Sequence, residues 1–129
     1  MNKRIRLQIL GGTYAISRLS ASSAIPAWAD GLGFVSISRG ADELSVVCLQ
    51  ERVPAGITTE GGWTAIRFVG PFAFDETGIL LSVAQPLSEG GIGIFVVSTY
   101  DEDHVLLKAA DMTRAAELLM QAGHILLSA

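Results

Sequence analysis

The stretch Phe72–Lys108, FAFDETGILLSVAQPLSEGGIGIFVVSTYDEDHVLLK, decides the fold, because a helix and three strand segments follow one another in it. Apolar side chains recur along one face of the expected helix, with Asp75 as its N-cap and Gly90-Gly91 at its end. The residues after Gly91 are apolar and β-branched, as in a strand, and an acidic turn leads into a second strand. The expected elements are a strand end at 72–74, a helix over 77–89, and strands over 92–97 and 104–108.

The rest of the chain predicts further strands and a second helix. Gly11 and Gly12 separate two alternating segments, which are expected to form a hairpin, and the Gly-rich stretch 53–62 is expected to be a linker. Asp111 is the expected N-cap of the second helix and Gly123 its stop. The expected strands are 5–10, 14–19, 34–38, 44–50, 63–69 and 124–127, with a helical turn at 24–29 and a helix from 112.

The second half therefore has the order β-α-β-β-α-β, which is the ferredoxin-like arrangement. In this arrangement the sheet is antiparallel and the helices cover one of its faces, so the predicted fold class is α+β. Pro86 conflicts locally with this pattern, because it removes an amide from the predicted helix and is expected to kink it near Ser82.

The two halves of the chain align without gaps at a shift of 61 residues. The shift carries Ile5-Arg6-Leu7 onto Ile66-Arg67-Phe68 and Asp42 onto Asp103. Because these matches fall at similar strand and turn positions, they predict a duplicated module. The expected domains are residues 1–60, with a reduced helix, and residues 61–129, with a full one.

Composition excludes several classes of function. The 129 residues carry a net charge of -4 without a cluster of Lys or Arg, so nucleic acid is not an expected partner. No apolar run is long enough for a signal peptide or a membrane span, and no membrane partner is expected. Cys48 is a lone cysteine within an apolar strand, which favours a reducing, cytoplasmic setting.

No catalytic or metal-binding set can be assembled from the sequence. His104, His124 and Cys48 fall in separate expected elements, and their spacing is not that of metal ligands. The chain is therefore predicted not to be an enzyme and to need no cofactor or metal.

A site for a small zwitterion is a better prediction. The start of the helix after Asp75 offers free backbone amides to a carboxylate, and Gly78 allows close approach. Five acidic residues in the two turns would favour an ammonium group or a cationic side chain. These acidic residues also fit a purely structural role, because Asp commonly caps helices and forms surface turns. The five are Asp75, Glu76, Asp101, Glu102 and Asp103.

Residues 74–80, 86–92 and 94–103 resemble the ACT-domain family, specifically the small tandem-ACT proteins similar to cytosolic arginine sensors and to aspartate-kinase regulatory domains. The resemblance also covers 25–29, 34–47 and Gly62-Trp63. It implies a non-catalytic regulatory module that binds a free amino acid at a module or dimer interface and forms a homodimer. The open alternative is a protein-interaction module that docks on an enzyme or regulator without a metabolite ligand.

The expected ligand site combines two segments. Backbone amides near the helix start would hold the carboxylate, while the acidic turn would receive the amine or a cationic side chain. The acidic excess makes a basic amino acid such as arginine or lysine the expected ligand. The candidate residues are Asp75, Glu76, Thr77, Gly78, Ile79, Ser98, Thr99, Asp101 and Asp103.

Overall fold

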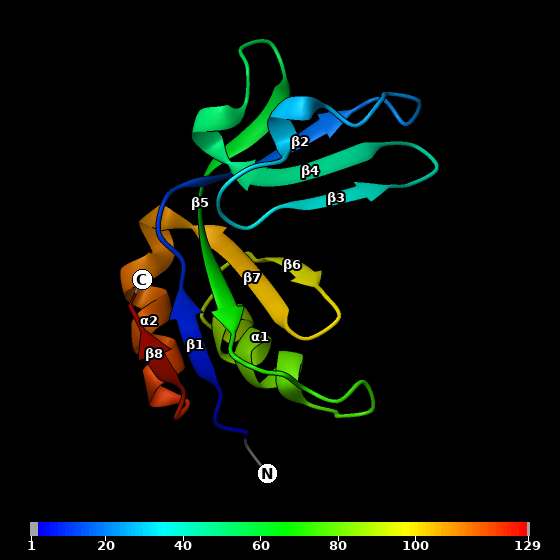
Figure 1. Ribbon diagram of the computed structural model, residues 1–129. Helices are drawn as coiled ribbons and strands as arrows, with labels where there is room; N and C mark the ends of the chain where they lie inside the picture. The colour runs from blue at the N-terminus through cyan, green and yellow to red at the C-terminus, as the bar shows by residue number, and fades with distance from the viewer. Residues whose placement is uncertain (1–2, 129) are drawn as a thin grey trace. The chain divides into compact units, whose positions relative to one another are not determined.

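The structure is a computed structural model that describes residues 3–128 (Figure 1). It contains both helices and sheet, which confirms the predicted α+β class. Contacts divide the chain into two compact units. One unit is Gly12–Trp63, and the other combines the chain up to Gly11 with the chain from Thr64 onward. Within the described residues, no helix has the length and apolar character needed to cross a membrane.

The Gly12–Trp63 unit is a small antiparallel sheet with short 3-10 helices. Strand β4 lies between β3 and β2, and β2 also pairs with the first part of β5. A small core on one side of this sheet contains Ala29, Val46 and Cys48. The elements are β2 (Tyr14–Leu19), η1 (Ala27–Ala29), β3 (Ser36–Arg39), β4 (Leu44–Leu49), η2 (Gln50–Arg52) and the start of β5 (Thr58–Phe68).

The other unit carries both α-helices. Its strand order is β6-β7-β5-β1-β8, in which β1 is antiparallel to β5 and parallel to β8. Both helices pack on one face, because residues such as Val83 and Leu119 share a core with Phe68 and Leu107. The elements are β1 (Arg6–Ile9), the end of β5, α1 (Ile79–Glu89), β6 (Phe95–Ser98), β7 (Asp103–Lys108), η3 (Ala109–Asp111), α2 (Met112–Gln121) and β8 (Ile125–Leu127).

The N-terminal strand corrects one expectation. β1 does not form a hairpin with β2, because it lies between β5 and β8, with Leu7 opposite Phe68 and also beside Leu126. The side chain of Leu7 is fully buried there. Without β1, the remaining strands have the ferredoxin-like order. The compact units divide at Gly11 and Trp63, while the two sequence modules of residues 1–60 and 61–129 stay a prediction.

The expected linker at 53–62 is wrong in its second half, where β5 already begins at Thr58. Gly61 and Gly62 lie within the strand. A Cβ atom at Gly61 would approach Gln50 Oε1 to 2.5 Å, and Gly62 has a positive φ of 78° next to an irregularity in the β2–β5 register. Gly61 is therefore needed for the close approach of Gln50, and Gly62 for the irregular pairing of β2 with β5.

The two hairpins β3–β4 and β6–β7 are equivalent at a shift of 59 residues, which corrects the shift of 61. Ser36 pairs with Val47 in the first hairpin, and Phe95 pairs with Leu106 in the second. The same turn hydrogen bond closes both hairpins, at 2.8 Å in each case. It runs from the Gly40 amide to the Glu43 carbonyl and from the Thr99 amide to the Glu102 carbonyl.

His124 compensates for the proline in α1. The helix includes Pro86, which has no amide to donate to the Ser82 carbonyl. The Ile5 amide donates to Nδ1 of the buried His124 ring at 3.0 Å. The proton therefore sits on Nε2, which donates to the Ser82 carbonyl at 2.7 Å. One imidazole thus joins α1 to the start of β1.

Candidate functional site

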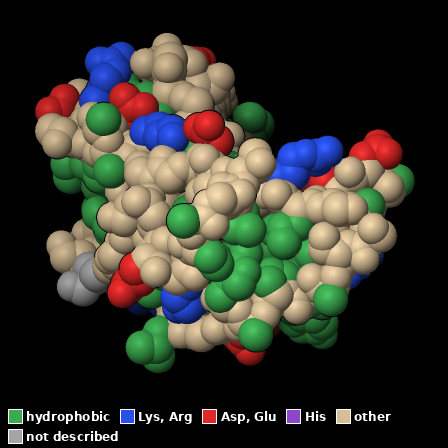
Figure 2. Space-filling model, turned by 90° about the horizontal axis from the view of Figure 1, so that it is seen from above, with side chains coloured by type: hydrophobic (Ala, Val, Ile, Leu, Met, Phe, Trp, Pro, Cys, Tyr) green, Lys and Arg blue, Asp and Glu red, His purple; other side chains and the backbone are tan. Residues whose placement is uncertain are grey.

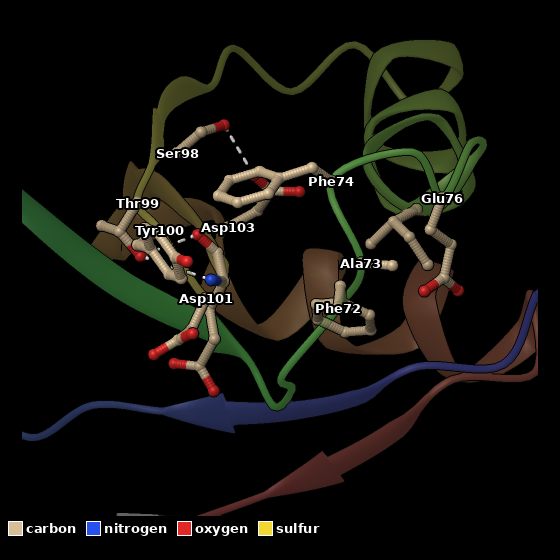
Figure 3. A pocket seen from close by; sticks show the side chains of 11 residues that line it. Phe72, Ala73, Phe74, Glu76, Ser98, Thr99, Tyr100, Asp101 and Asp103 are labelled. Carbon is tan, nitrogen blue, oxygen red and sulfur yellow. Dashed lines mark hydrogen bonds between the residues drawn. The ribbon is translucent and has the colours of Figure 1, made fainter.

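A pocket of about 180 Å³ lies between the segment before α1 and the turn between β6 and β7 (Figure 3). All of its lining residues belong to the unit that carries the helices. Six of the nine predicted site residues line it, namely Glu76, Ile79, Ser98, Thr99, Asp101 and Asp103. The other lining residues are Phe72, Ala73, Phe74, Tyr100 and Glu102.

The hydroxyl groups of Ser98 and Thr99 form hydrogen bonds within the turn itself. Ser98 Oγ donates to Asp103 Oδ1 at 2.6 Å, and Thr99 Oγ1 donates to the Glu102 carbonyl at 2.9 Å. The Glu102 amide also lies 3.3 Å from Thr99 Oγ1, which can accept from it. These bonds hold the turn in one shape, so Ser98 and Thr99 act first as supports for the acidic side chains.

Glu102 connects the turn to the end of β5. Both of its carboxylate oxygens lie 3.2 Å from Arg67 Nη1, and the Gly70 amide donates to one of them at 2.8 Å. The Phe72 amide donates to the Asp101 carbonyl at 3.1 Å. These contacts hold the chain after β5 against the turn and thereby form one wall of the pocket. Sequence reasoning did not assign this positioning role to Glu102, although a glutamate occupies the equivalent position, Glu43, in the first hairpin.

The start of α1 corrects the predicted cap. The helix begins at Ile79, and its N-cap is Gly78 with a left-handed φ of 80° and no side-chain cap. Asp75 therefore does not cap the helix, because this left-handed residue separates it from the first turn. A Cβ atom at Gly78 would meet only Lys3 Cε at 3.7 Å, so glycine is needed for conformation rather than for close approach. Asp75, Thr77 and Gly78 are not among the pocket-lining residues.

The negative charge of the pocket is concentrated on two of its carboxylates. Glu76 pairs with Lys3 at 3.2 Å, and Glu102 pairs with Arg67. Within residues 3–128, Asp101 and Asp103 have no Lys or Arg partner. Asp103 accepts the Ser98 hydroxyl, but a neutral donor leaves its charge uncompensated. The pocket therefore favours a cationic group near the β6–β7 turn.

Two aromatic side chains at the pocket were not assigned to the site from the sequence. Phe74 and Tyr100 contact each other edge to face, with ring centroids 4.8 Å apart and an interplanar angle of 82°. Both side chains are largely exposed, at 78% each. In Figure 3 the Phe74 ring extends from its loop toward the turn, whereas the Glu76 carboxylate points away from it. The sequence did contain a signal for them, because Phe72 and Phe74 are two aromatic residues in a segment that otherwise resembles a surface loop.

Burial shifts the pKa of two titratable groups among the described residues. Burial lowers the pKa of His104, opposed mainly by the charge of Glu102, with a smaller lowering effect from Arg67 and a raising one from Asp103. Burial also raises the pKa of the Cys48 thiol, against the opposing charge of Arg52, so Cys48 stays protonated. Among residues 3–128, no group of three His, Cys, Asp or Glu side chains could hold a metal ion.

Comparison with known families identifies the class of the helix-bearing unit. An ACT-domain model matches residues 58–121, and a separate model for an N-terminal domain matches residues 12–56. The chain belongs to the ACT-domain family, in agreement with the ferredoxin-like strand order and the paired helices.

Two solved structures have a similar fold. A crystal structure of an Agobacterium tumefaciens protein is 61% identical, covers 98% of this chain and 95% of that one, and has a TM-score of 0.94. The regulatory subunit of aspartate kinase from Thermus flavus shares the fold at 11% identity, with 94% and 97% coverage and a TM-score of 0.62.

The mouse cytosolic arginine sensor for mTORC1 subunit 1 is 30% identical over 107 residues, or 78% of this chain. The present chain spans only 30% of the length of that sensor. By their names, the Thermus flavus protein is a regulatory subunit and the mouse protein is a sensor.

Proposed function

We propose that this protein is a non-catalytic regulatory module that binds a free amino acid in the pocket between residues 72–79 and the β6–β7 turn. The observation that carries the proposal is the pair Asp101 and Asp103, two carboxylates in a pocket of about 180 Å³ that have no Lys or Arg partner among residues 3–128. Membership in the ACT-domain family and the name of the arginine sensor support an amino acid as the ligand.

The charge of the pocket supports a basic amino acid, such as arginine or lysine, over an acidic one. The cationic side chain would lie near Asp101 and Asp103, where Ser98 and Thr99 keep the turn in place. The carboxylate of the ligand would lie toward Ile79, at the N-terminus of α1, where helical amides are not capped by a side chain. The proposed amide donors are therefore those of Ile79 and the residues after it.

Thermal denaturation with a panel of common amino acids tests this proposal. A ligand at 100 times its dissociation constant adds about 2.7 kcal/mol to the free energy of unfolding, so a basic amino acid is expected to raise the melting temperature. Asp101→Asn is expected to weaken its binding about ten- to hundredfold, since an interaction with a charged group is lost. Asp42→Asn, at the equivalent position of the other hairpin, is the matched control and leaves binding unchanged. Tightest binding of an acidic amino acid would contradict the proposal, as would unchanged binding by Asp101→Asn.

We further propose a cytoplasmic homodimer, with neither nucleic acid nor a membrane as partner. Among the described residues, β6 pairs with β7 alone, so its other edge presents backbone groups that a second copy can pair with. This strand carries no charged residue, and Val96 is 38% exposed. Light scattering at tens of micromolar is expected to give the mass of a dimer. Val96→Lys is expected to shift the protein toward a monomer, whereas a dimer unaffected by this variant would place the interface elsewhere.

A docking module without a metabolite ligand is the second candidate function. Figure 2 shows one area of the surface on which hydrophobic side chains gather. On the helices, Leu81 and Met120 are 62% and 54% exposed, and a protein partner that docked on these helices would cover them. For this function, no amino acid in the panel would change the melting temperature.

A further inference from the structure

The exposed pair of Phe74 and Tyr100 is the feature of the pocket that packing does not explain. Each ring is 78% exposed, and their contact joins the segment before α1 to the β6–β7 turn. Single exposed apolar side chains are common on protein surfaces. Two aromatic rings held together beside a charged pocket instead form a platform on which a flat ligand group can stack.

The backbone holds this platform in place before any ligand arrives. The Phe72 amide donates to the Asp101 carbonyl, and the Gly70 amide donates to the Glu102 carboxylate, so both ring-bearing segments are tied to each other. A preorganised contact loses less conformational entropy on binding than one formed by free loops. The rings can therefore contribute to affinity as well as to shape.

The electrostatics of the rings and of the carboxylates act in the same direction. An edge-to-face pair uses the edge of one ring and a face of the other, so further ring faces remain available, and these faces attract cations. Asp101 and Asp103 add negative charge to the same pocket without a basic partner among residues 3–128. A guanidinium group is planar, weakly hydrated and able to stack while it donates to a carboxylate. An ammonium group is compact, strongly hydrated and stacks poorly.

We propose that Phe74 and Tyr100 are specificity-determining residues, which make the pocket select a guanidinium over an ammonium side chain. This inference rests on the proposed amino-acid site and adds the rings as the cause of discrimination. The guanidinium lies against a ring face and donates to Asp101 or Asp103. The selectivity for arginine over lysine then comes from the rings, because the carboxylates attract both.

Isothermal titration calorimetry with L-arginine, L-lysine and uncharged L-citrulline tests the inference. The wild-type chain is expected to bind arginine more tightly than lysine, and citrulline most weakly because it lacks the charge. Phe74→Leu and Tyr100→Leu are expected to weaken arginine binding by about three- to thirtyfold and lysine binding by less than about threefold. Tyr100→Phe keeps the ring and is expected to retain the arginine preference. Leu81→Ser, at an exposed position of α1 outside the pocket, is the control and leaves both affinities unchanged.

The outcomes separate this inference from the proposed function. A wild-type chain that binds no amino acid would overturn both. Wild-type binding with lysine as the tighter ligand would overturn the inference alone, as would equal weakening of arginine and lysine by the ring variants. Melting temperatures of the ligand-free variants exclude a folding defect, since both rings are largely exposed and their removal is expected to change stability little.

Discussion

The hairpins β3–β4 and β6–β7 share their register and turn bond, yet the described pocket lies beside the second. Gly40 and Ala41 occupy the positions of Thr99 and Tyr100, so the first turn lacks both the hydroxyl and the ring. The connections also differ, because a 3-10 helix of three residues follows β2, while a loop and the eleven-residue α1 follow β5. The pocket beside the second hairpin is thus lined by the residues of its turn and by the segment before α1.

The largest difference between the two hairpins is expected in how much their core side chains contribute to the free energy of unfolding. Leu107 and Cys48 are equivalent and both fully buried, but Leu107 belongs to the large core beneath the helices. Leu107→Ala is expected to cost about 2–5 kcal/mol of the free energy of unfolding, and Cys48→Ala about 0.5–1.5 kcal/mol, as for a methyl-sized group. Urea denaturation measures both. Equal costs would mean that the two hairpins are packed equally well.

The equivalent glutamates should show a smaller difference. Glu102 pairs with Arg67 and has a side chain only 15% exposed, whereas Glu43 pairs with Arg18 at 3.5 Å and is 48% exposed. Glu102→Gln is expected to cost about 1–2 kcal/mol, because a charged hydrogen bond in a partly buried site is weakened. Glu43→Gln is expected to cost at most about 0.5 kcal/mol. Urea denaturation at low salt and at 1 M salt measures both losses relative to the wild type. Equal losses for the two variants at low salt, reduced equally at 1 M salt, would contradict this expectation.

The pH dependence should give the smallest effect. His104 occupies the position of Ser45, and burial lowers the pKa of His104 in the folded chain. The unfolded chain therefore binds this proton more readily, so stability present above about pH 6.5 is lost as pH falls through the folded pKa. The free energy of unfolding is expected to decrease between pH 7.5 and 5, and His104→Gln is expected to flatten this decrease. If the free energy of unfolding of His104→Gln decreased with pH as steeply as that of the wild type, the effect would come from the carboxylates instead.

Local patterns in the sequence were sufficient to predict the second hairpin, both helices and the fold class. Helical periodicity and β-branched runs act over a few residues, and the packing of α1 and α2 agrees with them. Pairing between distant segments has no such local signal. The alternation in residues 5–10 fits any strand, and burial of Leu7 between β5 and β8 determines its actual partner.

The sequence predicted the acidic residues of the candidate site, but not the start of α1 or the contact between the two loops. The acidic turn was recognisable because Ser98, Asp101 and Asp103 are close in sequence. The start of α1 was misplaced, since Asp75 has the chemistry of a cap, but the left-handed Gly78 takes that position. The contact of Phe74 with Tyr100 depends on how two loops meet, which short-range patterns do not contain.

The insertion of β1 between β5 and β8 has a consequence for synthesis on the ribosome. Residues 12–63 are contiguous, so that unit can form as soon as it has emerged. The other unit needs its first strand and its last, and Ile5 meets His124 across 119 residues of sequence. β1 therefore has no strand partner until β5 has been synthesised. Its second edge then stays unpaired until β8 has been synthesised. During that interval its backbone is open to wrong partners, so the speed of translation and a chaperone at the nascent chain should affect the yield of folded protein.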